Sequence, residues 1–270
     1  MKMNKMGFSG CLMALAVLLG SIFAGYTQDA AKPAPKKLLL VTLTKGWGHS
    51  SIPTGIKVTK ELAEKSGAFT VDTVATDGEM AAKMTPEALK NYDGVFFLST
   101  TGELPLPDKA AFLEWIKSGK GFIGAHSATD TFHGSGPGVD PYIDMIGAEF
   151  LTHTETRVEC INEDPTHPAT QGLGKTWALA DEIYIFKNFN RDRVHMLLSL
   201  DKTPGGGQPG YYPISWCKKY GQGNVFYTAL GHGNEMWENP EFQKHLLGGI
   251  KWSLGLEKGD SVPQAKAAAK

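Results

Sequence analysis

Three histidines, His49, His126 and His232, follow short apolar segments and glycines at widely separated places in the chain. In a parallel sheet the carboxyl ends of the strands share one edge, and neighbouring strands lie only ~5 Å apart. Imidazoles at three such ends can therefore meet in one crevice. Imidazole titrates near neutrality and also binds divalent metals, so the pattern predicts either acid–base catalysis or a metal site.

Further acidic and histidine residues extend this group. His153 lies in a loop that we expect before a strand, from which it either reaches the crevice or stays on the surface. Glu182 follows Asp181 at the start of a strand, where it could orient an imidazole proton or bind a metal; an exposed acid pair is the alternative. The predicted catalytic residues are His126, His232 and Glu182, and the predicted ligands for zinc or manganese are His49, His126 and His153.

Residues beside the histidines indicate the class of ligand. Trp47 and Trp237 lie in histidine loops, and aromatic faces stack on sugar rings, although tryptophan is also common in cores. The chain has only three arginines, no basic cluster and a formal net charge of −1, which argues against nucleic acid and phosphorylated ligands. We therefore expect a small, uncharged carbohydrate as ligand. The predicted substrate-binding residues are His49, Trp47, Ser127, Asp130, His153 and Trp237.

Nucleophilic catalysis is disfavoured. Ser127 follows His126, but the surrounding residues are not Gly-x-Ser-x-Gly, and no cysteine stands at a strand end. Beyond the N-terminal segment the only cysteines are Cys160 and Cys217. They could pair in an oxidising compartment, but a domain of this size does not need a disulfide, so we predict two buried thiols.

The N-terminus has the pattern of a secretory signal. Lys2 and Lys5 precede an almost continuous apolar run over 11–24, which is too short for a stable transmembrane span. We predict a signal peptide over 1–24 and an extended linker over 25–36, with an uncleaved anchor as the alternative. The protein is then expected to be secreted or periplasmic, without a membrane contact after cleavage.

The elements that would position the histidines alternate between strand and helix. Continuous apolar runs are typical of strands buried on both faces, and helices between them imply a parallel sheet with right-handed crossovers. We predict strands at 37–44, 69–74, 94–98 and 121–125, and helices at 54–66 and 106–118. The second half is expected to hold strands at 157–161, 181–186 and 194–200, a hairpin of 214–218 with 224–230, a helix at 240–254, and a disordered tail over 257–270.

Several motifs together resemble the ThuA-like, or trehalose utilisation, family over about 37–256. They are the glycine-rich loop that reaches His49 and Ser50, and residues 124–130, 146–150 with His153, 166–170 with 172–173, 181–184, 230–232 and 250–255. The resemblance implies the fold of class I glutamine amidotransferases, which is an α/β, flavodoxin-like three-layer sandwich with a mostly parallel sheet.

The resemblance also bears on activity. It implies that His126 stands where those amidotransferases carry their nucleophilic cysteine and His232 where they carry a catalytic histidine, so glutaminase activity is not expected. It further implies a sugar dehydrogenase as a pathway partner and an action on 3-keto sugars. We expect a carbohydrate-processing protein that acts on keto-sugars or glycosides by histidine acid–base chemistry, as an isomerase, lyase or hydrolase. The alternatives are a non-catalytic sugar-binding protein and a metal-dependent glycoside hydrolase.

Overall fold

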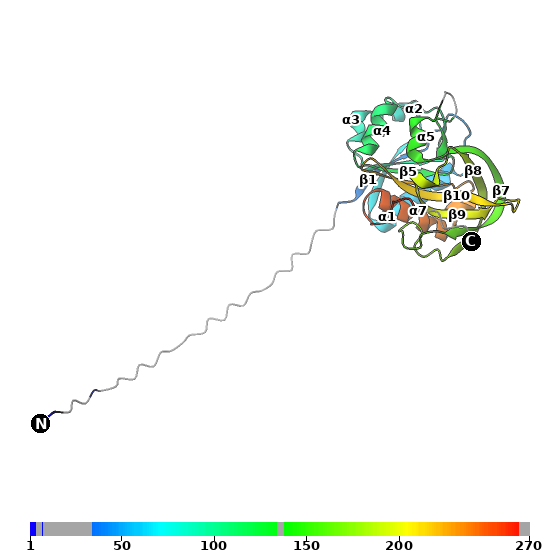
Figure 1. Ribbon diagram of the computed structural model, residues 1–270. Coiled ribbons are helices and arrows are strands. Elements are labelled where there is room, and N and C mark those ends of the chain that lie inside the picture. The colour runs from blue at the N-terminus through cyan, green and yellow to red at the C-terminus, as the bar shows by residue number, and fades with distance from the viewer. Residues whose placement is uncertain (4–6, 8–33, 134–137, 265–270) are drawn as a thin grey trace. The chain divides into compact units, whose positions relative to one another are not determined.

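The protein is described by a computed structural model that covers residues 1–3, 7, 34–133 and 138–264 (Figure 1). The predicted signal peptide and linker lie mostly outside these residues, and so do the last six residues of the predicted tail. Within the described part of the chain, no helix has the length and apolar character needed to cross a membrane.

Five parallel strands form the first half of a nine-stranded sheet among the described residues, in the order β2-β1-β3-β5-β11-β10-β9-β7-β8. Three of them have the predicted bounds and the other two differ at their ends. The parallel strands are β1 (Lys36–Val41), β2 (Phe69–Val74), β3 (Gly94–Leu98), β5 (Gly121–Ala125) and β11 (Gly223–Thr228). The predicted α/β three-layer architecture is confirmed.

Both faces of this sheet are covered by helices (Figure 1). Successive side chains of a strand point to opposite faces, so Leu38 and Leu40 pack into one core while Leu39 and Val41 pack into the other. The first core is closed by α1 (Ile52–Ser66), α6 (Asn234–Glu238) and α7 (Pro240–Ser253), and the second by α2 (Asp77–Lys83), α3 (Pro86–Leu89), α4 (Lys109–Lys117) and α5 (Pro141–Ile146).

The rest of the sheet is antiparallel and longer than predicted. It comprises β10 (Pro209–Tyr220), β9 (His195–Lys202), β7 (Glu149–Asn162) and β8 (Thr176–Lys187). The predicted loop around His153 is wrong, because this residue lies inside β7 and pairs with Tyr184 of β8. The residues around His153 in β7 are mostly polar and do not alternate with apolar residues. The strand is therefore defined there by its pairing with β8 rather than by burial. Figure 1 shows both strands as long curved ribbons.

The C-terminal segment is ordered further than predicted. The Trp252 indole donates to the carbonyl oxygen of Gly259, and the Met196 backbone N–H donates to the Gln264 side chain. These hydrogen bonds hold the chain against the sheet as far as residue 264, so the predicted disordered tail over 257–270 is wrong in its first part. Cys160 and Cys217 are free and buried, as predicted.

Candidate active site

His126 occupies a tight corner between β5 and the short 3-10 helix η1 (His126–Thr129). Its φ of 51° lies in the left-handed region, which is uncommon for a residue other than glycine and is often found at functional sites. Its Nδ1 donates to the carbonyl oxygen of Ala229 at 2.9 Å, just beyond β11. Since a carbonyl can only accept, this bond fixes the proton on Nδ1 and leaves the Nε2 lone pair free in the neutral ring.

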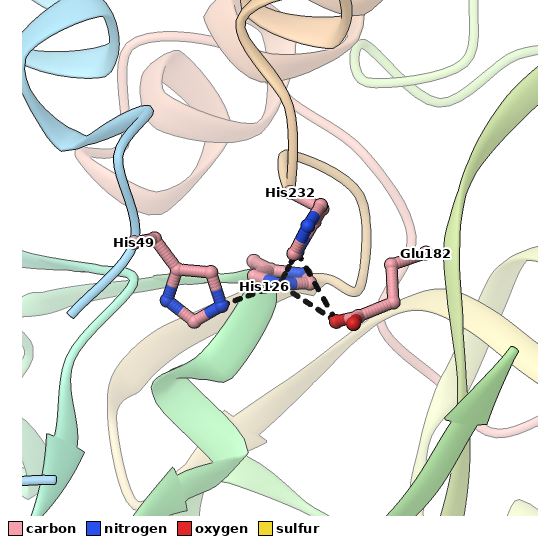
Figure 2. A group of neighbouring side chains, drawn as sticks. All are labelled: His49, His126, Glu182 and His232. Atoms are coloured by element: carbon pink, nitrogen blue, oxygen red, sulfur yellow. Dashed lines mark hydrogen bonds and ion pairs between the residues drawn. The ribbon is translucent and has the colours of Figure 1, made fainter. Parts of the chain in front are cut away.

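His49 and His232 bring their rings to that lone pair (Figure 2). His49 comes from the loop before α1, and its Nε2 lies 3.1 Å from His126 Nε2. His232 comes from the loop after β11, and its Nδ1 lies 3.2 Å from the same atom. The predicted convergence of the three histidines is thus present in the structure.

Glu182 completes the cluster from β8, the last strand in the sheet order. Its Oε2 lies 3.3 Å from His126 Nε2 and 3.2 Å from His232 Nδ1. Its other oxygen, Oε1, lies 2.8 Å from Nδ1 of His153. The carboxylate therefore joins the buried histidines to one that is half exposed.

Burial and mutual charge set the protonation of the group. Burial, together with the neighbouring imidazoles His126 and His232, lowers the pKa of His49 to about 3. Burial opposes ionisation of Glu182, but its close contacts with the imidazoles of His126 and His232 outweigh burial and hold its pKa well below the usual range. A hydrogen bond to Glu182 raises the pKa of His232. Near neutrality the cluster thus holds an ionised carboxylate beside at least one neutral imidazole.

The spacing of the four donor atoms fits a metal ion. One ligand atom from each of His49, His126, Glu182 and His232 lies within 4.8 Å of the others. Ligands about 2.0–2.1 Å from a zinc ion in tetrahedral array would be separated by about 3.3 Å. Four of the six separations, 3.1, 3.2, 3.3 and 3.2 Å, are close to that value, and the other two lie within 4.8 Å.

Other contacts orient these ligands. The Tyr184 hydroxyl lies 3.0 Å from His126 Nε2, and the Ser127 hydroxyl lies 3.4 Å from His49 Nδ1. The Gly231 backbone N–H donates to an oxygen of Asp181 at 2.7 Å, which holds the loop that carries His232. The Ser127 contact and the His126 Nδ1 bond to Ala229 are of the kind that fixes ring orientation in metal sites, because each involves the ring nitrogen that faces away from the cluster.

A cavity of about 430 Å³ opens above the cluster. His126 is 0% exposed and is not among the lining residues, whereas the other three cluster residues line the cavity. Trp47, 71% exposed, covers one side. The remaining lining residues are Thr101, Ser127, Asp130, Phe150, His153, Glu155 and Tyr184.

Two site predictions need correction. Trp237 is 0% exposed and cannot touch a ligand; its indole donates to the carbonyl oxygen of Gly231 and supports the His232 loop from the core side. His153 binds the outer oxygen of Glu182, so the geometric ligand set is His49, His126, His232 and Glu182 rather than one that includes His153.

Sequence reasoning missed Tyr184, Phe150 and Thr101 as site residues. Tyr184 stands two positions after Glu182, so on a strand both side chains must project from the same face. That spacing could have identified it. Phe150, near the start of β7, and Thr101, shortly after β3, follow no comparable pattern, because they meet the cavity only in the folded chain.

The fold and the cluster define a class of protein: a three-layer α/β sandwich with a histidine–carboxylate centre at the carboxyl edge of its parallel strands. The sequence matches the family described as trehalose utilisation over residues 37–253. The chain therefore belongs to the ThuA family, which associates it with carbohydrate metabolism. No protein of curated function matches it.

Solved structures agree with this assignment. A ThuA-like protein from Bacteroides uniformis is 22% identical, with a TM-score of 0.64 over 85% of this chain and 95% of its own. A second, from Parabacteroides merdae, is also 22% identical, with a TM-score of 0.62 over 82% and 90%. A β-galactosidase from Rahnella sp. R3 is 11% identical, with a TM-score of 0.53 over 83% of this chain but 32% of its own. At these identities the likeness shows the fold.

Proposed function

We propose that this protein is a metal-dependent carbohydrate-processing enzyme that acts on keto-sugars or glycosides. The observation that supports this most is the group of three imidazoles and one carboxylate beneath an open cavity. In the secreted or periplasmic compartment that the N-terminal sequence predicts, its substrate would be an extracellular sugar. A sugar dehydrogenase would supply the oxidised form.

The cluster fits a divalent ion better than a hydrogen-bonded network alone. His126 Nε2 carries a lone pair, and the ionised Glu182 carboxylate brings an oxygen, which can also only accept, to within 3.3 Å of it. Two lone pairs so close repel unless a hydrogen or a cation lies between them. The residues that would hold zinc or manganese are His49, His126, His232 and Glu182, and an ion there would polarise a carbonyl or hydroxyl oxygen of the sugar.

This arrangement changes the roles first predicted for the histidines. His126 is fully buried, and His232 would commit its Nδ1 to the metal ion, so neither would keep a basic nitrogen that faces a substrate. His153 is better placed, because it lines the cavity with 49% of its side chain exposed. Its Nδ1 is held by Glu182, which leaves Nε2 free to exchange a proton with a bound sugar.

The cavity walls suit an uncharged sugar. Trp47 and Phe150 offer aromatic faces on which a ring can stack. Hydroxyl and carboxylate groups of Thr101, Ser127 and Asp130 can exchange hydrogen bonds with ring hydroxyls. No lysine or arginine is among the residues that line this cavity, as expected for a ligand without phosphate.

The test combines elemental analysis with turnover. The mature protein should contain about one zinc or manganese ion per chain, convert 3-keto-glycosides, and lose activity when a chelator removes the metal. His126→Asn should lose both metal and activity, because asparagine tolerates the left-handed backbone but offers no imidazole. His153→Gln should keep the metal and lose turnover.

Two other results would distinguish between the candidate functions. A metal-free, fully active preparation would exclude the metal centre. Saturable sugar binding without turnover in the metal-loaded protein would instead support a sugar-binding protein.

A further inference from the structure

Residues 257–264, at the C-terminal end of the described chain, form a strap over a second group of polar side chains outside the candidate active site. The members of this group are Asp164, His167, His195 and Cys217. Gly259 of the strap packs so closely on His167 that a Cβ added there would lie 2.6 Å from the ring. The Cys217 thiol donates to the carbonyl oxygen of Asp260 at 3.4 Å. The strap therefore helps to bury both the imidazole and the thiol.

His195 joins the strap to the connection between β7 and β8. Its Nδ1 lies 2.7 Å from the carbonyl oxygen of Val262 in the strap. Its Nε2 lies 2.9 Å from Oδ2 of Asp164 in that connection. A carbonyl and a carboxylate only accept, and a neutral imidazole carries a single N–H. Both hydrogen bonds therefore form together only when the ring is an imidazolium.

An ionised carboxylate faces this ring. Burial opposes ionisation of Asp164, but hydrogen bonds from Thr166 and His195 outweigh burial and hold its pKa below the usual value. The His195 side chain is only 4% exposed, and an unpaired charge at such a depth would be costly. The neighbouring carboxylate offsets that cost, so the two residues form an ion pair that also holds the strap.

Three other titratable groups face His195. The ring centroid of His167 is 6.1 Å away, and burial lowers the pKa of this histidine to about 4. Cys217 pairs with His195 across β9 and β10, and burial raises the pKa of its thiol. Asp260 is ionised near neutrality, because backbone N–H groups of the next two residues donate to it and lower its pKa. Of these described groups, His195 is the one whose change of charge near neutrality would alter the contacts of the strap.

Loss of one proton from His195 breaks one of its two hydrogen bonds. A carboxylate is a stronger acceptor than a carbonyl, so the remaining proton stays on Nε2, facing Asp164. Nδ1 then turns a lone pair to the Val262 oxygen 2.7 Å away, and the two atoms repel. The other hydrogen bonds between the strap and the rest of the protein join uncharged groups, through Trp252, Cys217 and Gln264.

We propose that residues 257–264 form a pH-sensitive strap, which protonated His195 holds in place in acid and which is released as the pH rises past neutrality. The hydrogen bond to Val262 is complete while the ring carries both protons and is lost with the second one. This inference does not depend on the proposed carbohydrate function.

The reactivity of Cys217 reports the position of the strap. Release removes the Asp260 carbonyl that accepts the thiol hydrogen. The thiol sulfur also lies 3.6 Å from Nε2 of His167, whose Nδ1 accepts from the Ala169 backbone N–H. Nε2 therefore carries the hydrogen of this neutral ring and can stabilise a thiolate. An open strap should thus leave Cys217 both more accessible and more reactive.

Thiol labelling of the full chain tests this. Iodoacetamide is applied at about pH 5.5 and about pH 8.5, on either side of the range in which imidazole titrates. Peptide mass spectrometry follows Cys217 and Cys160 separately, and each rate is divided by the rate of the same cysteine in the urea-unfolded chain at that pH. The normalised rate of Cys217 should rise roughly tenfold or more at the higher pH, because a hydrogen bond from a charged group is lost. Cys160, equally buried but in β7, should not change.

Two substitutions should remove the pH dependence in opposite ways. Asp164→Asn keeps the oxygen that accepts from Thr166 and replaces Oδ2 by an N–H donor, so a neutral His195 can accept from it and still donate to Val262. Its Cys217 should react slowly at both pH values. His195→Gln places an amide at the Nε2 position but nothing at Nδ1, so Cys217 should react rapidly at both.

The matched control is Asp260→Asn, which removes a charge from the strap but keeps the oxygen that accepts from the next two backbone N–H groups. It should retain the pH response of the wild type. An unchanged Cys217 rate in the wild type, an equal rise at Cys160, or a pH response that survives in both Asp164→Asn and His195→Gln would overturn the proposal. Loss of the response in Asp260→Asn would also overturn it, because a general charge effect would then account for the change.

Discussion

Glu182→Gln should weaken metal binding far more than a change at any neighbouring carboxylate. Glu182 supplies the only carboxylate of the four-residue group and lies 3.3 and 3.2 Å from two of the histidine ligands. The amide has the same shape but no charge, so the packing of β8 against the cluster is kept. The substitution therefore isolates the contribution of the charge.

The size of the effect can be bounded. Removing a group that only supports a metal ligand weakens binding by about 10–100-fold. A direct anionic ligand should exceed that range, so we expect a loss of at least about 100-fold in zinc affinity, or about 2.7 kcal/mol. At a fixed excess of zinc, the stabilisation of the folded state by the metal should fall by the same amount.

Zinc titration against a competing chelator measures the affinity, and thermal unfolding with and without zinc measures the linked stability. The control is Glu155→Gln, because Glu155 is 76% exposed in its side chain and lies 3.9 Å from His232 Nε2. It should change affinity less than about 10-fold. Wild-type zinc affinity in Glu182→Gln would refute the assignment of this carboxylate as a ligand.

Three further predictions concern stability. Trp237→Phe removes the donor to the Gly231 carbonyl in a fully buried site, and should lower the free energy of unfolding by about 2 kcal/mol in urea. Burial lowers the pKa of His245 from 6.5 to about 4, so the unfolded chain binds a proton that the folded chain does not. The contribution of His245 to stability should therefore be complete above about pH 6.5 and fall by up to about 3 kcal/mol as pH drops toward 4. His245→Gln should remove this contribution, while that of His167, whose pKa burial also lowers to about 4, remains; an unchanged pH profile would contradict the prediction. Gly248→Ala would place a methyl group 2.0 Å from the carbonyl oxygen of Pro168, and should destabilise α7 packing by about 3 kcal/mol in the same urea assay, whereas wild-type stability would show that the contact relaxes freely.

The corner at His126 links the fold to the proposed chemistry. Its left-handed backbone and the Nδ1 bond to Ala229 aim one nitrogen at the centre of the cluster. Both cysteines lie elsewhere in the core, and burial raises the pKa of Cys160 to about 12. The residue at the corner is thus suited to bind a metal rather than to attack a carbonyl carbon.

The parallel half of the fold could be predicted because its strands are buried on both faces. Residues 38–41 and 94–98 are continuous apolar runs, and such runs have few alternatives to a central strand. β7 and β8 could not be predicted in full, because exposed residues such as Thr152 and Glu155 carry no apolar signal. Their strand structure depends on pairing with each other, which is a long-range interaction.

For the site, the sequence by itself determined that His49, His126 and His232 stand where parallel strands lead to one edge. It also named Glu182 as their carboxylate partner, but with an exposed acid pair as the alternative. Glu182 belongs to the strand at the far end of the sheet order, and only the curved β7–β8 hairpin brings it to within 3.3 Å of His126. The orientation of Trp237 was also decided by tertiary packing, since a tryptophan beside a histidine loop can face either the ligand or the core. Local patterns fix where a strand ends, whereas the direction of a side chain beyond that end depends on what the rest of the chain packs against it.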